Sequence, residues 1–434
     1  MITKLNFTDR TIKSYAIRKL TPKECFRLMG VRDNVIGTMQ SSNAQAAERL
    51  PDWNGKGNPE DMAISASQQY KQAGNSIVVD VLAHIYEQLF YPAPPKPRPG
   101  MQLSLFDDLE DTLPSMPPTA DKNEEKIFLT TFSGYDSQLM AADVLREWHP
   151  DFRWTCKGWS DIDKYACQMH NLVFPQFADC ALGDITKIDW HEVKRSLDGR
   201  EVDLFTYSSP CQDISQAGKQ MGLQEGSDTR SALLWRVADA VEVLRPKYLL
   251  QENVAALVSQ KFMPDFQKWL DKLSSLGYVS RWARLNAKNY GVPQNRDRVF
   301  CISMRRDVAF DYQFPEPFEL KTRLEDVLEE EVSDRYFLKD DAVSKFLKAN
   351  DSDNALFVQF DLPPTHEAAM FLKTWLTLRM NTLNGWGREL DELRNCIENE
   401  RDVFNSDFAS FNECHTFPCE GFEELFKENM ERKK

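Results

Sequence analysis

Between residues 127 and 310 the sequence alternates short apolar runs with longer, helix-like stretches, and this alternation constrains the fold more than any other feature. The apolar runs at residues 127–132 and 202–207 have the length of strands. Strands that alternate with helices along a chain form a parallel sheet with helices on both faces. We therefore predict an α/β fold built on a doubly wound, mostly parallel sheet, with a smaller carboxyl-terminal region.

The strand expected at residues 202–207 ends in a proline-containing turn that carries Cys211. In open α/β sheets, ligands and reactive groups collect at the carboxyl ends of the strands. A cysteine that follows proline among polar side chains is a candidate nucleophile, because its thiolate is the reactive form. The alternative is that Cys211 is a small buried side chain. The polar, glycine-punctuated residues 213–232 predict a mobile lid.

Polar side chains also follow the other expected strands. The turn after residues 127–132 has a single glycine, Gly134, which is too few for a dinucleotide-binding fingerprint, so we expect no nicotinamide cofactor. Asp161 follows the second strand, where a carboxylate can accept hydrogen bonds from a ribose. Asp184 follows the third strand, where it could read an adenine amino group, and Glu252 ends a fifth.

The amino-terminal residues 1–90 contain two predicted helices. Thr21 is placed to cap the first, which has a proline at its first helical position. Asn75 and Ser76 precede the second, an apolar helix at residues 77–90. These two side chains either cap that helix or offer, with its free backbone N–H groups, an edge that faces a ligand.

Residues 91–126 are rich in proline and acidic residues, which predicts an extended linker. The linker holds an apolar pentapeptide at residues 102–106, and leucine and phenylalanine have no place in a solvated segment unless they dock. The pentapeptide resembles the short motif by which bacterial proteins bind the replication sliding clamp. Docking on the protein's own surface is the alternative. The side chains that would make either contact are Gln102, Leu103, Leu105 and Phe106.

Composition adds several expectations about partners and location. The formal net charge of -14 argues mildly against a nucleic-acid partner, because phosphate contacts need lysine and arginine, although a local basic cleft is compatible with this average. No apolar run is long enough to span a bilayer, and the first residues do not open a signal peptide. Nine scattered cysteines fit reduced thiols. We expect a soluble, cytoplasmic monomer with no membrane partner.

Four stretches resemble, in this order, the motifs of the C5-cytosine DNA methyltransferases. They are Phe-x-Gly at 132–134, Pro-Cys-Gln at 210–212, Glu-Asn-Val at 252–254 and Gln-x-Arg-x-Arg at 294–298. The first of these motifs lacks the later glycines of that family. Two amino-terminal stretches, residues 18–33 and 68–90, resemble its last two motifs, which normally follow the target-recognition domain. The chain therefore resembles a circular permutant of the family.

The permutation implies four parts of the chain. They are residues 1–90, which complete the catalytic domain; residues 91–126, the linker; residues 127–337, the catalytic methyltransferase core; and residues 338–434, the target-recognition domain. The permutation also predicts that the helix at residues 77–90 packs against the strand at residues 127–132, despite the long linker between them.

The resemblance implies a DNA cytosine-5 methyltransferase that takes its methyl group from S-adenosylmethionine. Because C5 of cytosine is a poor nucleophile, Cys211 would add to C6 and build electron density at C5. Glu252 would protonate or hydrogen-bond N3, and Arg298 would hold the carbonyl oxygen of the base. Asn253 would hold the geometry of the loop, and Arg296 would support the turn.

The resemblance also assigns binding residues. The expected cofactor-binding residues are Phe132, Gly134, Asp161, Ile162, Asp184, Ile185, Asn75, Ser76 and Ile77. Double-stranded DNA is the expected partner, contacted by Gln212 and Ser215. Thr382 and Arg388 lie in a loop that either faces DNA or is an ordinary surface turn.

Two other functions fit the same residues. A tRNA cytosine-5 methyltransferase would use the same nucleophile and is favoured by the acidic balance of the chain. A weakly active DNA-binding module tethered to the clamp is the second alternative. Cys414, His415 and Cys419 are poor evidence for zinc, because no second pair of ligands accompanies them, so no metal is expected.

Overall fold

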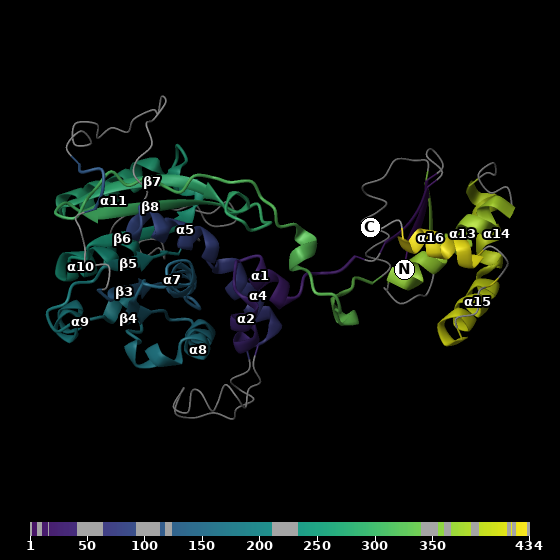
Figure 1. Cartoon of the computed structure of the whole chain (residues 1–434), viewed down its shortest axis with the longest axis horizontal. Coiled ribbons are helices and arrows are strands. Elements are labelled where there is room, and N and C mark those ends of the chain that lie inside the picture. Colours follow the sequence, from purple (N-terminus) through teal and green to yellow (C-terminus); the bar gives the residue numbers. More distant parts are fainter. Residues whose placement is uncertain are drawn as a thin grey trace. The chain divides into compact units, whose positions relative to one another are not determined.

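The computed structural model describes residues 2–6, 11–15, 17–40, 64–92, 113–117, 124–210, 233–339, 355–359, 366–382, 390–414, 418 and 422–431. They form two compact units, one of Pro22–Leu328 and one of Met1–Thr21 together with Glu329–Lys434 (Figure 1). Among the described residues, no helix combines the length and the apolar character needed to cross a bilayer.

The larger unit is built on a mixed sheet, which in the described residues has six strands in the order β4-β3-β5-β6-β8-β7. The neighbours from β4 to β6 pair in parallel, and β8 runs antiparallel between β6 and β7. This order confirms the predicted α/β fold with a doubly wound, mostly parallel sheet. The strands are β3 (Lys126–Thr131), β4 (Trp154–Ser160), β5 (Leu204–Tyr207), β6 (Tyr248–Val254), β7 (Tyr278–Asn286) and β8 (Asp297–Arg305).

Helices cover both faces of this sheet, and strands buried in this way need continuous apolar sequences. Every residue of β3 and β5 is buried. Phe128 belongs to the hydrophobic cluster on one face, whereas Ile127 and Leu129 belong to the cluster on the other. The first cluster includes α5 (Val79–Phe90), α7 (Ser137–Trp148) and α8 (Lys164–Val173), and the second includes α9 (Trp190–Ser196), α10 (Leu234–Leu244) and α11 (Met263–Ser275).

The helices between Pro22 and Phe90 complete this unit, as Figure 1 shows for the purple and blue helices beside the teal ones. Phe90 of α5 stacks on Phe128 of β3 with ring centroids 6.0 Å apart, and Tyr86 meets the same ring edge-on at 5.7 Å. The predicted packing of this helix on the first strand is therefore confirmed. The helices that precede α5 are α1 (Pro22–Arg27), α2 (Asp33–Met39) and α4 (Ala66–Asn75).

The smaller unit joins the two ends of the chain. β1 (Ile2–Asn6) pairs antiparallel with both β2 (Thr11–Tyr15) and β9 (Ala355–Gln359). The predicted boundaries put residues 1–21 in the catalytic segment, but the structure places them with the carboxyl-terminal residues. The reason is that a two-stranded hairpin is marginal alone, and β9 gives it a third strand. The helices are α13 (His366–Thr382), α14 (Leu390–Asn399), α15 (Arg401–Cys414) and α16 (Phe422–Glu431).

Short 3-10 helices complete the connections between these elements. They are η2 (Pro175–Cys180), η3 (Ile185–Lys187), η5 (Ala255–Val258), η6 (Ala287–Asn289), η7 (Leu324–Val327) and η8 (Asp334–Tyr336).

Candidate active site

A cavity of about 350 Å³ lies at the carboxyl ends of β3, β4, β5 and β6, the edge where the sequence predicted a site. The ends of these strands and the turns after them form most of its wall, and the rest comes from the end of α4, the first turns of α7 and α8, and the start of β8. Its size falls in the usual range of small-ligand sites. The predicted residues that line it are Phe132, Gly134, Asp161, Ile162, Asn75, Ser76, Ile77, Glu252, Asn253, Arg296 and Arg298.

The predicted nucleophile, Cys211, lies outside the described residues, and so does the predicted lid at residues 213–232. The chain is described as far as Pro210, which lines the cavity together with Ser208 and Ser209. The residue immediately before Cys211 is therefore part of the cavity wall.

Most of the residues predicted to contact macromolecules also lie outside the described part of the chain. They are Gln212, Ser215, Arg388, Gln102, Leu103, Leu105 and Phe106. Thr382 is the last residue of α13, so it lies at the end of a helix and not in the loop that was predicted to contain it.

Two predicted cofactor residues, Asp184 and Ile185, are not among the residues that line the cavity. Asp184 Oδ1 accepts hydrogen bonds from the backbone nitrogen and from Oγ1 of Thr186 at 3.0 and 2.8 Å, which lowers the pKa of its carboxyl and caps η3. Ile185 is buried in the hydrophobic cluster that includes α9. The third strand predicted before Asp184 is not formed, because the described residues between β4 and β5 contain helices and turns, and the aspartate caps a turn instead of ending a strand.

The turn after β3 has an unusual backbone. Phe132 has φ 53°, in the left-handed region that a bulky residue adopts at a cost of about 1–2 kcal/mol. Its carbonyl oxygen accepts a hydrogen bond from Ser208 Oγ at 3.3 Å, which ties this turn to the one before Cys211. Backbone strain of this kind is held in place by its surroundings and is typical of functional sites.

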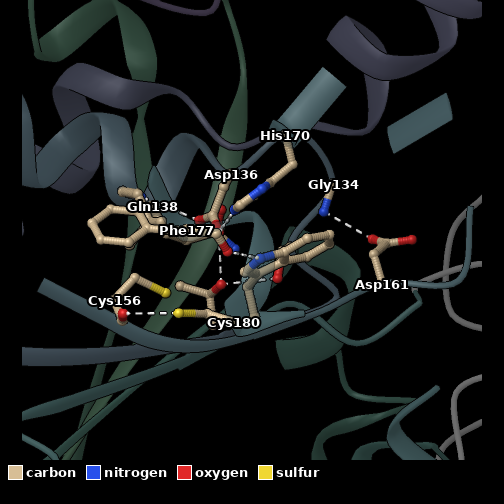
Figure 2. Close-up of polar contacts among 12 residues, drawn as sticks. Gly134, Asp136, Gln138, Cys156, Asp161, His170, Phe177 and Cys180 are labelled. Atoms are coloured by element: carbon tan, nitrogen blue, oxygen red, sulfur yellow. Dashed lines mark hydrogen bonds and ion pairs between the residues drawn. The ribbon is translucent and has the colours of Figure 1, made fainter. Parts of the chain in front are cut away.

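Asp161 joins the turns that follow β3 and β4. Its Oδ2 accepts a hydrogen bond from the backbone nitrogen of Gly134, and its Oδ1 accepts one from that of Asp163, both at 2.8 Å; Figure 2 shows the contact to Gly134. Burial raises the pKa of Asp161, and these backbone hydrogen bonds oppose the rise. Each carboxylate oxygen keeps a further lone pair, so a hydroxyl group in the cavity can still donate to it.

Glu252 and Arg298 form an ion pair on adjacent strands. Arg298 Nε lies 3.1 Å from Glu252 Oε1, and 10% of the glutamate side chain is exposed. Burial raises the pKa of Glu252, while the guanidinium groups of Arg298 and Arg296 act in the opposite direction. A buried carboxyl group whose pKa is raised beside a cation is typical of a site for acid–base chemistry.

The side chains of Asn253 and Arg296 hydrogen-bond to the backbone of other segments that line the cavity. Asn253 Nδ2 donates to the backbone oxygen of Ser209 at 3.2 Å, and its Oδ1 accepts from the backbone nitrogen of Val254 at 2.9 Å. Arg296 Nη2 donates to the carbonyl oxygens of Gly74 and Ser76 at 2.9 and 2.6 Å. Asn253 thus connects β6 to the turn before Cys211, and Arg296 connects α4 to the turn before β8.

Two features of the site were not predicted from the sequence. Lys71 and Asp163 line the cavity and form an ion pair at 2.6 Å. Asp136 and His170 form a buried pair behind the turn after β3 (Figure 2). The sequence did contain a signal for the Asp136–His170 pair, because Asp136 follows residues 132–134 in the stretch where the family's motif continues with glycines.

The sheet order and the cavity at its carboxyl edge define an α/β protein with a Rossmann-like methyltransferase fold. The chain belongs to the C-5 cytosine-specific DNA methylase family, whose sequence profile matches residues 2–91 and 146–386, more than half of the chain.

The chain is also similar to individual bacterial enzymes. It is 48% identical over 162 residues to the type II methyltransferase M2.ScrFI of Lactococcus lactis subsp. cremoris, across 37% of this chain and 43% of that protein. It is 40% identical over 161 residues to the orphan methyltransferase M.SssI of Spiroplasma monobiae, across 36% of this chain and 39% of that protein. The match therefore spans less than half the length of each of these relatives.

Proposed function

We propose that this protein transfers the methyl group of S-adenosylmethionine to C5 of a cytosine flipped out of double-stranded DNA. The observation that carries the proposal is the buried Glu252–Arg298 pair, which lines the same cavity as Pro210, the residue before Cys211 in the sequence. An acid, a cation that can bind a carbonyl oxygen and an adjacent thiol are the groups that this chemistry needs. Membership of the C-5 cytosine-specific DNA methylase family supports the same substrate.

The residues at the cavity fit S-adenosylmethionine. Phe132 and Ile162 supply apolar surface for an adenine ring, and Ile162 is 75% exposed, so a bound ring would remove apolar area from water. Asp161 keeps lone pairs for ribose hydroxyl groups. Asn75 and Ser76 offer polar atoms at the end of α4. The bound cofactor would supply an electrophilic methyl group on its sulfonium sulfur.

The protein's own residues would act on the cytosine. The thiolate of Cys211 adds to C6, which raises the electron density at C5. Glu252, whose pKa burial raises, protonates or hydrogen-bonds N3. Arg298 holds the carbonyl oxygen of the base, and Asn253 keeps the turn before Cys211 in place through its hydrogen bond to Ser209. Unstacking the base costs a few kcal/mol, which contacts in the enclosed site would offset.

The proposal is tested by incubating the full-length protein with S-adenosylmethionine labelled in its methyl group, and with duplex DNA or tRNA. We expect the label in 5-methylcytosine of DNA. Label in tRNA alone would support the tRNA cytosine-5 methyltransferase instead. Cofactor binding without transfer to either nucleic acid would support the DNA-binding module. Bisulfite sequencing of DNA from an expressing host would then give the recognition sequence.

Several finer assignments belong to the same proposal. The chain is a circular permutant in which the amino-terminal residues from Pro22 complete the catalytic domain, the residues from 127 to Leu328 form its core, and the unit of Met1–Thr21 and Glu329–Lys434 recognises the target. Support comes from the packing of α5 on β3. The described cysteines are free thiols, which is compatible with a cytoplasmic location, and we propose a monomer.

We also propose that the linker pentapeptide at residues 102–106 binds the bacterial sliding clamp. Support comes from its two leucines and phenylalanine in a segment that is otherwise proline-rich and acidic. Deletion of these five residues should abolish binding to purified clamp while methyl transfer to free DNA continues. Unchanged clamp binding after the deletion would contradict the assignment.

A further inference from the structure

The turn between β3 and α7 contains an aspartate in a backbone conformation that favours glycine. Asp136 has φ 67° and ψ 57° and is the N-cap residue of α7. A residue with a side chain adopts this conformation only at a cost, although aspartate tolerates it better than most because its short side chain can form local hydrogen bonds. Its carboxylate is also fully buried, at 0% exposure. Something must therefore stabilise both its backbone and its charge.

The buried carboxylate has donors on both of its oxygens. Oδ2 accepts a hydrogen bond from Thr130 Oγ1 at 2.7 Å, and Oδ1 accepts one from the backbone nitrogen of Leu139 at 3.2 Å. His170 Nε2 lies 3.4 Å from Oδ2, and the imidazole is itself 0% exposed. These contacts fix the aspartate to β3, to α7 and to α8.

His170 is held in turn by β4. Its ring stacks on Trp159 with centroids 3.8 Å apart and an angle of 21° between the planes. The indole Nε1 of Trp159 donates to the carbonyl oxygen of Phe177 at 2.8 Å. Two residues after Trp159 along the chain is Asp161, which binds the backbone nitrogen of Gly134. Figure 2 shows Asp136 facing His170 on one side of this turn and Asp161 meeting Gly134 on the other.

Neither Asp136 nor His170 lines the cavity, whereas Ser133, Gly134 and Tyr135 between β3 and Asp136 do. We propose that the buried Asp136–His170 pair is a positioning device that holds the turn after β3 in its left-handed form and so shapes the S-adenosylmethionine site. A glycine at position 136 would adopt this left-handed backbone without strain, and in this chain the contacts of the pair stabilise the aspartate in it instead. The inference rests on the proposed function, because it takes the ligand of this cavity to be that cofactor.

The test is the affinity of the full-length protein for S-adenosylhomocysteine, measured by calorimetry on variants of both residues. Asp136→Ala loses the carboxylate and keeps the backbone penalty, so we expect binding about tenfold weaker. Asp136→Gly relieves the backbone penalty and should bind more tightly than the alanine variant. Asp136→Asn tolerates the left-handed backbone and keeps the N-cap acceptor, so it should remain within about twofold of the wild type.

His170→Phe tests the pair from its other side, and it serves if Asp136→Ala does not fold. It keeps a ring to stack on Trp159 but removes the nitrogen near Asp136, so we expect about fivefold weaker binding. The matched control is Asp189→Ala, because Asp189 caps α9 with an ordinary φ of -81° and does not line the cavity. That variant should lose stability and keep the wild-type affinity.

A positioning role also predicts a split between binding and chemistry. Once cofactor is saturating, single-turnover methyl transfer by His170→Phe should match the wild type within about twofold, because the pair does not touch the reacting atoms. Folded Asp136→Ala and His170→Phe proteins that both bind S-adenosylhomocysteine as tightly as the wild type would overturn the inference alone. A wild-type protein that does not bind S-adenosylhomocysteine would overturn the proposed function and this inference with it.

Discussion

The larger and the smaller unit differ in the polar groups that they bury. In the larger unit, Asp136, His170, Glu252 and Asn253 are buried at or near the cavity at the carboxyl edge of the sheet, and Lys126, Asp203 and Arg305 are buried at the opposite edge. In the smaller unit, the buried polar side chains of the described residues are Thr21 and Thr374. Its core is instead a cluster of aromatic and aliphatic side chains.

This difference has a physical meaning. Burying a polar or charged side chain is unfavourable unless partners compensate it, so a fold that only needs stability fills its core with apolar groups. The smaller unit follows that rule, as the ring of Phe371 shows by packing within 4.7–6.0 Å of the rings of Phe404, Phe408, Phe411 and Phe422. Substitutions should therefore separate the two kinds of core, because those of buried polar groups at the cavity affect chemistry and those in the apolar core of the smaller unit affect stability.

Glu252→Gln gives the largest expected effect. The variant cannot donate the proton that the ring nitrogen of cytosine needs, so we expect methyl transfer to fall roughly a thousandfold. Cofactor affinity, measured by calorimetry, should change little because Asp161 and Phe132 are untouched. The matched control is Arg236→Ala, which removes an exposed ion pair on α10 at 3.5 Å and should leave the rate unchanged.

Phe371→Ala is the corresponding test in the smaller unit. The side chain is 0% exposed, and its loss should destabilise that unit by about 3 kcal/mol, measured by thermal unfolding. Binding of S-adenosylhomocysteine to the larger unit should persist. A Phe371→Ala variant that unfolds at the wild-type temperature but binds no S-adenosylhomocysteine would contradict the distinction between the units.

The pH dependence of methyl transfer is a third test, with a smaller expected change in rate. Burial raises the pKa of Glu252, so its proton is present at low pH and is lost as the pH rises through that raised pKa. The single-turnover rate should therefore fall on the alkaline side by about tenfold per pH unit, and Glu252→Gln should not show this limb. A wild-type rate that rises over this alkaline range, or a Glu252→Gln variant whose rate still falls there, would contradict a proton-donating role.

Asn253→Ala gives the smallest expected effect. It removes the hydrogen bond that holds the backbone of Ser209, two residues before Cys211, and we expect methyl transfer about tenfold slower, in line with the loss of one buried hydrogen bond. Cofactor affinity should not move. Equal losses in affinity and rate would show that Asn253 supports the whole cavity and not only the turn that carries the thiol.

Residues that the sequence predicted from separate motifs line one cavity, whereas the two units divide the chain at other residues than those predicted. Glu252, Asn253, Arg296 and Arg298 were predicted together, and they line one cavity because motifs at the ends of adjacent strands must meet at one edge of the sheet. The pairing of β1 with β9 could not be anticipated, because the partners lie about 350 residues apart and two short strands carry no signal for each other.

Individual residues show where the prediction reached its limit. Asp184 was predicted to follow a strand as Asp161 does, but the described residues between β4 and β5 contain no strand, and Asp184 caps η3 while Asp161 lines the cavity. Which role such a carboxylate takes depends on the path of the next turn, which a single sequence does not contain. The Asp136–His170 contact joins residues 34 positions apart on different helices, and nothing local marks the histidine as a partner.

The most direct measurement is covalent trapping on duplex DNA that contains 5-fluorocytosine, with S-adenosylmethionine present. Because the fluorine at C5 cannot leave as a proton does, we expect a complex that survives denaturation and a mapped adduct on Cys211. Cys211→Ser should form none. An adduct that persists in Cys211→Ser, or methylation of ordinary DNA by that variant, would contradict the account.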